Sequence, residues 1–141
     1  QVTASKDTLT QAEQNTLMSR ISNAVLKSER APVEDPDAQS LVWAYFNELP
    51  QNAIYVGGEA LAEPPLRIAV TTPEGALNQD ARKTLVAEIG EIVDDIVGPF
   101  EGRLNQWTML YELDEGSWSG SGQIFGLADI QAAMNIQAVQ H

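Results

Sequence analysis

The chain contains no cysteine and only one histidine, His141, which is the last of its 141 residues. The lack of cysteine excludes a disulfide framework, a cysteine-based zinc site, a cysteine nucleophile and iron–sulfur ligation. A single histidine also argues against a histidine-rich metal site and a Ser-His-Asp triad. We therefore expect neither a metal nor a cofactor.

Positive charge is also scarce, because 8 Lys and Arg residues face 20 Asp and Glu residues, for a formal net charge of −12. Phosphate backbones and anionic lipids repel such a chain, so we expect neither nucleic acid nor a membrane as a partner. No apolar run approaches the roughly 18 residues of a membrane span. The length of the chain fits one compact domain, and we expect it in the cytoplasm, with which the lack of cysteine is compatible.

The sequence repeats itself in two collinear blocks. Placing Val2 on Val70 aligns 2–25 with 70–93, an offset of 68, and placing Trp43 on Trp107 aligns 42–58 with 106–122, an offset of 64. Three of the identical pairs keep helical spacing, as a shared buried face requires: Leu17/Leu85, Ile21/Ile89 and Val25/Val93. Other identical pairs include Val2/Val70, Trp43/Trp107 and Gly58/Gly122. We interpret the chain as one domain made of two repeats, 1–62 and 65–126, followed by a tail at 127–141.

Each repeat has the pattern of a strand, a helix, a strand and a short hairpin. In the second repeat, alternation predicts a strand over 65–72, Asn78 caps a helix over about 79–96, and a strand follows over 105–113. The predicted buried stripe of this helix is Leu85, Val86, Ile89, Ile92, Val93 and Ile96.

In the first repeat, Thr10 to Glu13 form a capping box that opens a helix to about residue 27. Its predicted stripe is Leu17, Met18, Ile21, Ala24 and Val25. A polar, proline-containing loop over 28–39 and a strand over 40–48 follow. In the tail, Ile130, Met134 and Val139 have near-helical spacing, which predicts a docked terminal helix.

The first strand of the first repeat is short, since only Gln1 to Ala4 precede a turn. At the offset of 68, the counterpart of Pro65 would lie about four positions upstream of Gln1. We expect either a shortened strand or a strand whose start lies outside this sequence.

Two segments resemble signatures of the tautomerase superfamily. Residues 65–89 have its opening proline, short strand, Glu-Gly turn, polar helix start and Leu/Ile stripe, and residues 46–58 have a glutamate at a strand end with Gly-Gly after the hairpin. Residues 111–122 keep the second pattern more weakly. The double-length form is similar to cis-3-chloroacrylic acid dehalogenase and its relatives. The resemblance implies an α+β fold: two tandem βαβ units form a four-stranded sheet with two helices on one face, plus a C-terminal helix, and three chains assemble into a trimer.

The strand residues favour a homotrimer independently of the resemblance. Large apolar side chains occupy both alternating faces of the predicted strands, as in a sheet that is covered on both sides. One face carries Trp43, Tyr45, Trp107, Met109 and Tyr111, and the other carries Ala44, Phe46, Thr108 and Leu110.

The resemblance implies proton transfer or hydration on small 2-keto or unsaturated carboxylic acids, carried by an N-terminal proline amine. This sequence offers Gln1 at that place, and Pro65 lies mid-chain, where its amide nitrogen is no base. The catalytic residue therefore stays unknown, and the protein is expected to be either a divergent tautomerase, active if a proline precedes Gln1, or an inactive relative. A different class remains open: a non-enzymatic ferredoxin-like βαββαβ module that binds a small ligand or a protein.

The resemblance also indicates where a pocket for a small carboxylate would lie. The lining candidates are Val25, Tyr45, Thr72, Trp107, Met109 and Trp118. Several of them replace the family's arginine, histidine and tyrosine, so the polar catalytic set does not carry over. Lys6 and Arg67 are weak candidates for anion binding, and the competing interpretation is an exposed lysine and an interface or solvent-facing arginine.

Overall fold

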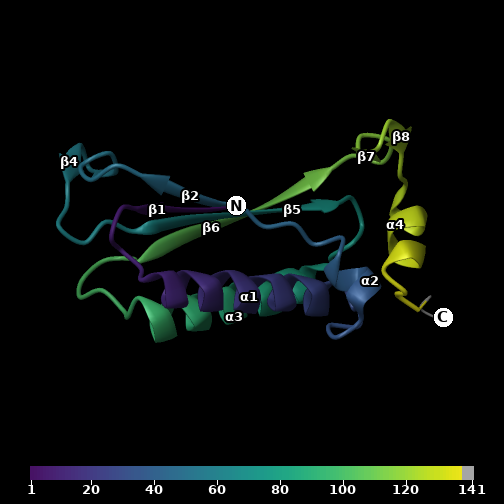
Figure 1. Cartoon of the computed structure of the whole chain (residues 1–141), viewed down its shortest axis with the longest axis horizontal. Helices are drawn as coiled ribbons and strands as arrows, with labels where there is room; N and C mark the ends of the chain where they lie inside the picture. The colour runs from purple at the N-terminus through teal and green to yellow at the C-terminus, as the bar shows by residue number, and fades with distance from the viewer. Residues whose placement is uncertain (138–141) are drawn as a thin grey trace.

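The computed structural model describes residues 1–137, so Val139 and His141 lie outside the described part of the chain. A four-stranded mixed sheet carries two long antiparallel helices on one face, and no helix within residues 1–137 covers its other face (Figure 1). The strand order is β2 (Phe46–Leu49), β1 (Val2–Ser5), β5 (Leu66–Pro73) and β6 (Gln106–Leu113). The helices are α1 (Gln11–Ser28) and α3 (Gln79–Ile96), and a shorter α4 (Leu127–Ala133) closes the described chain. The predicted α+β architecture is confirmed.

Each strand–helix–strand unit pairs its own two strands in parallel. β1 lies beside β2 and β5 beside β6, while β1 and β5 run antiparallel at the centre. A ferredoxin-like domain instead has split βαβ units, in which another strand separates the two. The ferredoxin-like alternative is therefore wrong as a description of the topology.

The two long helices begin where their capping residues predict. The Thr10 side chain accepts a hydrogen bond from the Glu13 N–H, and the Glu13 carboxylate accepts one from the Thr10 N–H, which completes the capping box. The Asn78 side chain accepts a hydrogen bond of 2.8 Å from the Ala81 N–H. Each cap satisfies backbone donors that the first helical turn leaves without partners.

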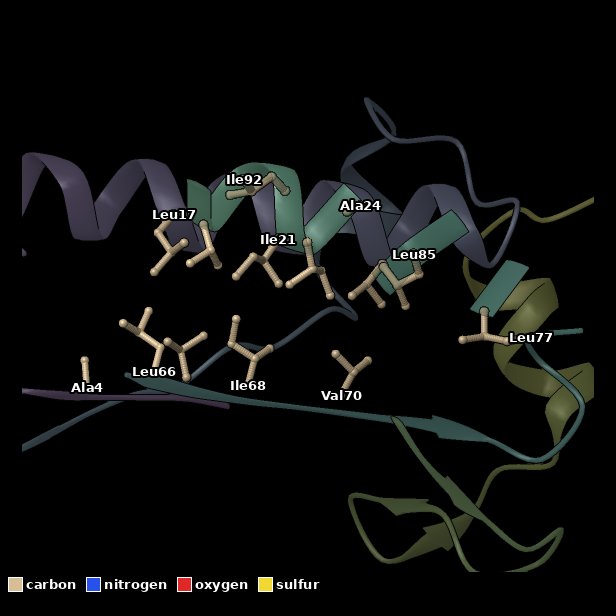
Figure 2. Packing of buried hydrophobic residues seen from close by; sticks show 14 residues of the cluster. Ala4, Leu17, Ile21, Ala24, Leu66, Ile68, Val70, Leu77, Leu85 and Ile92 are labelled. Atoms are coloured by element: carbon tan, nitrogen blue, oxygen red, sulfur yellow. The ribbon is translucent and has the colours of Figure 1, made fainter. Parts of the chain in front are cut away.

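The main core lies between the helices and the sheet (Figure 2). Leu17 and Ile21 from α1 and Leu85 from α3 point toward the sheet, where Ile68 and Val70 point back toward them. The alternation along β5 buries one face and exposes the other. The stripe prediction was wrong at Val86, which is 37% exposed, because it lies one residue beyond the buried face that Leu85 occupies.

Two ion pairs join the helices on their outer side. Arg20 of α1 contacts Asp95 of α3 at 3.1 Å, and Lys27 of α1 contacts Glu88 of α3 at 3.8 Å. In both pairs α1 supplies the cation and α3 the anion. The side chains are substantially exposed, so each pair contributes little to stability.

A second, smaller core lies beyond the end of α1. The segment 28–39, predicted to be a loop, contains a short helix, α2 (Pro36–Gln39), which starts there because Asp35 caps it and Pro36 suits its first position. The predicted terminal helix is confirmed as α4 and packs here through Ile130 and the following Met134. The buried members are Leu26, Ala31, Ala38 and Met134.

The predicted strand over 40–48 was too long, because β2 begins only at Phe46. Its parallel partner β1 pairs Val2 with Phe46, and among the described residues no strand pairs with 42–44. A β-prone sequence becomes a strand only where a partner supplies hydrogen bonds.

Two small hairpins extend from the sheet at its two ends (Figure 1). One joins β3 (Tyr55–Val56) to β4 (Glu59–Ala60), and the other joins β7 (Ser119–Gly120) to β8 (Gln123–Ile124). Both turns place two residues at positive φ, which matches the twist of the flanking strands. None of the helices in residues 1–137 is long and apolar enough to cross a membrane.

Candidate functional site

A cavity of about 680 Å³ lies at the start of β1, where Gln1 and Val2 line it. Its walls come from α1, the segment 41–45, β5, β6, the β7–β8 hairpin and α4. The volume lies in the range of small-molecule sites. The cavity reaches from the helix side, at Met18 and Val25, to the open face of the sheet, at Arg67 and Tyr111.

Arg67 is the one lysine or arginine among the residues that line this cavity. Its neighbours in β5, Leu66 and Ile68, are buried against the helices, so alternation places Arg67 on the open face. Its guanidinium donates a 3.2 Å hydrogen bond to the hydroxyl oxygen of Tyr111, on the adjacent strand β6. In a chain with a net charge of −12, this cation stands out among the lining residues.

The positive charge of Arg67 also acts on the amino group of Gln1, just before β1. The α-amino group of Gln1 donates a hydrogen bond of 2.7 Å to the Ala69 carbonyl oxygen. Burial and, second, the nearby Arg67 charge lower the pKa of this amine. The charged form of this amine is thus disfavoured, first because burial removes it from water and second because the Arg67 charge repels it.

The helix side of the cavity holds a buried carboxyl group. Glu29 is the C-cap of α1, is only 8% exposed and lines the cavity. Burial raises the pKa of Glu29 to about 7. Near neutral pH this side chain is therefore divided between its neutral and its charged forms.

The remaining walls beside Arg67 are mainly aromatic. Tyr45 comes from the segment before β2, Trp118 from the residue before β7, and Phe125 from the residue after β8. Phe125 lies close over Gly120, where an added Cβ would meet its ring at 3.2 Å. The hairpin therefore fits against its own aromatic residue, and a side chain at Gly120 would displace a cavity wall.

The candidate residues from the sequence divide into two groups. Val25, Tyr45, Trp118 and Arg67 line the cavity together, from four separate segments. Thr72, Trp107 and Met109 are not among its lining residues. Thr72 is 3% exposed on the helix-facing side of β5, whereas Trp107 is 67% exposed on the open face.

Lys6 lies elsewhere, at a second cavity of about 550 Å³ beyond the other end of β1. Asp7 and Glu63 also line that cavity, and their negative charges offset the positive charge of Lys6. Of the two anion-binding candidates, Arg67 is the one with an apolar cavity beside it.

The sequence analysis missed Glu29, Tyr111 and Phe125 as residues of the cavity. Glu29 continues the spacing 17, 21, 25 of the buried stripe, and a carboxyl group at that spacing was the available signal. Tyr111 occupied the same predicted face as Tyr45. No pattern in the sequence marked Phe125. Within residues 1–137, no group of three or more His, Asp or Glu residues could hold a metal ion.

Comparison with known proteins gives matches among solved structures. No protein-family model matches the chain, and no curated protein sequence matches it either. A structure of Pt0534 inactivated by 2-oxo-3-pentynoate aligns with a TM-score of 0.72 at 23% identity, over 87% of this chain and 92% of that one. The Q0 fused 4-OT, a symmetric trimer, aligns with a TM-score of 0.69 at 20% identity, over 93% and 95%.

A third structure is N1, a member of the cis-3-chloroacrylic acid dehalogenase family, with a TM-score of 0.72 at 17% identity, over 87% and 80%. The chain has the fold of these proteins. The resemblance to the tautomerase superfamily that the sequence suggested is thus confirmed at the level of the fold. The fold alone does not fix an activity, which depends on the residues of the site.

Proposed function

We propose that this protein transfers protons on small 2-oxo or unsaturated carboxylic acids, bound in the cavity beside Arg67. The observation that carries the proposal is the pair of Arg67 and Tyr111 at the edge of an otherwise mostly apolar cavity. An arginine fixed by a neighbouring hydroxyl presents a planar fork that matches a carboxylate. The structurally similar proteins include one inactivated by 2-oxo-3-pentynoate, which supports a 2-oxo acid as the substrate class.

Each wall of the cavity has a part in this function. Arg67 binds the carboxylate, and Tyr111 holds the guanidinium in place. Tyr45, Trp118 and Phe125 exclude water from the carbon chain, which strengthens the contact with Arg67. The resemblance to the tautomerase superfamily implies an amine at the start of the first strand as the proton carrier, and the cavity lies at that end of β1.

The test is the enol–keto conversion of phenylpyruvate and of 2-hydroxymuconate, followed by absorbance. We expect Arg67→Gln to raise KM by about 10- to 100-fold, since a hydrogen bond to a charged group contributes about 1.5–3 kcal/mol. Lys83→Gln removes a cation that does not line the cavity and serves as the control. Turnover that Arg67→Gln leaves unchanged would contradict the proposal. Binding of these acids without turnover would favour a binding module instead.

We also propose that the open face of the sheet is the contact between three copies of the chain. Trp43, Trp107 and Tyr45 are 75%, 67% and 55% exposed. Apolar groups of this size are rarely left in contact with water over a whole sheet face. A trimer is the state of the Q0 fused 4-OT. Sedimentation at micromolar concentration should give three times the chain mass, and Trp107→Lys should give monomers; a stable wild-type monomer would contradict the trimer.

A further inference from the structure

We propose that Glu29 recognises the end of the ligand that lies opposite its carboxylate, and that this end carries a hydroxyl group. The carboxylate of such a ligand binds Arg67 on the open face of the sheet, and its hydroxyl donates a hydrogen bond to the Glu29 carboxyl on the helix side. Both residues line the same cavity. The inference rests on the proposed function, because it takes the position of the ligand carboxylate from there.

Glu29 is a buried carboxyl group whose charge nothing nearby compensates. It is 8% exposed, and burial raises its pKa. Within residues 1–137 neither a cation nor a hydrogen-bond donor offsets this effect of burial. Buried polar side chains in proteins nearly always have a hydrogen-bond partner, so this exception calls for one.

The carboxyl oxygens of Glu29 are open to the cavity. In the described part of the chain, the fully enclosed side-chain polar atom without a partner is Nη1 of Arg103, and the Glu29 oxygens are not enclosed in this way. They therefore keep contact with open space, and the space that Glu29 lines is the cavity. A ligand in the cavity is thus placed to supply the missing donor.

The fold does not require a carboxyl group at this position. Glu29 is the C-cap of α1, where the negative end of the helix dipole disfavours a carboxylate. At the offset of 68 its counterpart is Val97, the C-cap of α3, which packs against the main core. An apolar side chain therefore suits this position in the other unit. A residue that costs stability and lines a cavity is a candidate for a role in the site.

The surroundings of Glu29 favour a hydroxyl over other donors. Ile21 and Val25 precede it by two turns and one turn of α1 and line the same cavity, as does Met134. An ammonium group would lose its hydration among these apolar side chains, and pairing with a carboxylate seldom does more than offset that loss. A second carboxylate would be repelled by ionised Glu29. A hydroxyl carries no charge and donates to a carboxyl in either of its forms.

The test compares phenylpyruvates that differ at the end opposite the carboxylate. A hydroxyl in the meta position, a hydroxyl in the para position and a para hydroxymethyl group give three reaches. Each is paired with the analogue that has a methyl group in place of the hydroxyl. Affinity is measured by calorimetric titration at pH 8, where most of Glu29 is ionised and accepts only. The measurement needs no turnover.

We expect the wild type to bind one of the three hydroxyl forms at least about tenfold more tightly than its methyl analogue. Glu29→Met removes the acceptor at similar length and should reduce this preference to less than about twofold. Glu29→Gln keeps an acceptor oxygen and should keep a preference. Glu91→Met serves as the control, because it removes an exposed carboxyl outside the cavity lining and should leave the preference unchanged.

The wild type also gives a reading that needs no variant. Carbon-13 resonances report the pKa of Glu29, which should be lower with the hydroxyl form bound than with its methyl analogue, because a donated hydrogen bond favours the carboxylate. The reverse order would overturn the inference. So would equal affinities at all three reaches, a preference that Glu29→Met keeps, or tighter binding of a para aminomethyl form than of the para hydroxymethyl form. If Arg67→Gln leaves the affinity of every acid unchanged, the proposed function fails, and this inference fails with it.

Discussion

The two strand–helix–strand units differ in their sheets and not in their helices. α1 and α3 have 18 residues each, and both bury an apolar stripe against the sheet. β5 and β6 pair over eight residues, whereas β1 and β2 pair over four. The two helices reach the same length because capping residues and an apolar stripe within each helix define it. A strand, in contrast, extends only as far as a neighbouring strand pairs with it.

The largest expected loss of stability occurs at one of two equivalent isoleucines. Ile89 of α3 is fully buried, whereas Ile21 of α1 lines the cavity. Ile89→Ala should reduce the free energy of unfolding by about 3–5 kcal/mol, since it opens a new void in a filled core. Ile21→Ala should cost about 1–2 kcal/mol less, because part of its surroundings is already empty. Urea denaturation of both variants measures this, and equal losses would show that the cavity does not loosen the first unit.

The second comparison concerns the C-caps of the two helices, Glu29 in α1 and Val97 in α3. The pKa of Glu29 is raised from 4.5 to about 7 by burial, so the folded state prefers the neutral carboxyl. The wild type therefore loses stability as the pH rises from about 4.5 to 7. Glu29→Gln should not lose it, and its advantage at pH 8 should be on the order of 3 kcal/mol.

The measurement is thermal unfolding of the wild type and Glu29→Gln at pH 4 and at pH 8. At pH 4 both chains are neutral at this position and should unfold at similar temperatures. An advantage that is the same at both pH values would show that the amide acts by packing and not by charge.

A smaller difference is expected at the two N-caps, Thr10 and Asn78. Replacing either by alanine should cost about 1 kcal/mol, because one backbone donor of the first turn loses its partner. In the first unit the Glu13 carboxylate also accepts a hydrogen bond from the Thr10 N–H, whereas the counterpart of Glu13 in α3 is Ala81. Glu13→Ala should therefore cost a further few tenths of a kcal/mol. Chemical denaturation resolves these steps, and no measurable loss of stability for Thr10→Ala would contradict the role of the cap.

The smallest effect is expected at the ion pairs between the helices. Arg20→Gln and Lys27→Gln should each change the free energy of unfolding by less than about 0.5 kcal/mol, since the charges are exposed and screened. The effect should vanish in about 1 M salt. A loss above about 1 kcal/mol that persists in salt would indicate that these side chains act through packing.

The sequence predicted the helices well, because their signals lie within a few residues of each other. Thr10 and Asn78 identified the first turn of each helix, and the stripes through Leu17 and Leu85 identified the buried faces. The strand over 40–48 was overestimated for the opposite reason. Its aromatic and β-branched residues favour a strand, but the sequence of this segment contains no information about whether a neighbour pairs with it.

The cavity could be predicted only in part. Val25, Tyr45, Trp118 and Arg67 were named from a resemblance, and the structure brings them together. Thr72 is not among the lining residues, since its side chain is buried on the helix-facing side of β5. Glu29 was marked only by its place in the spacing of the buried stripe, because the extent of its burial depends on segments far away in the sequence.

The ion pairs between the helices have a consequence for how the two halves recognise one another. At the offset of 68, Arg20 corresponds to Glu88 and Lys27 to Asp95, so the two pairs are the same contact with the charges exchanged. A half that met a copy of itself would place like charges at all of these positions. Repulsion between like charges thus disfavours the association of either half with a copy of itself, and the two ion pairs favour the pairing within one chain. The two halves therefore share a shape while they differ in the charges between their helices.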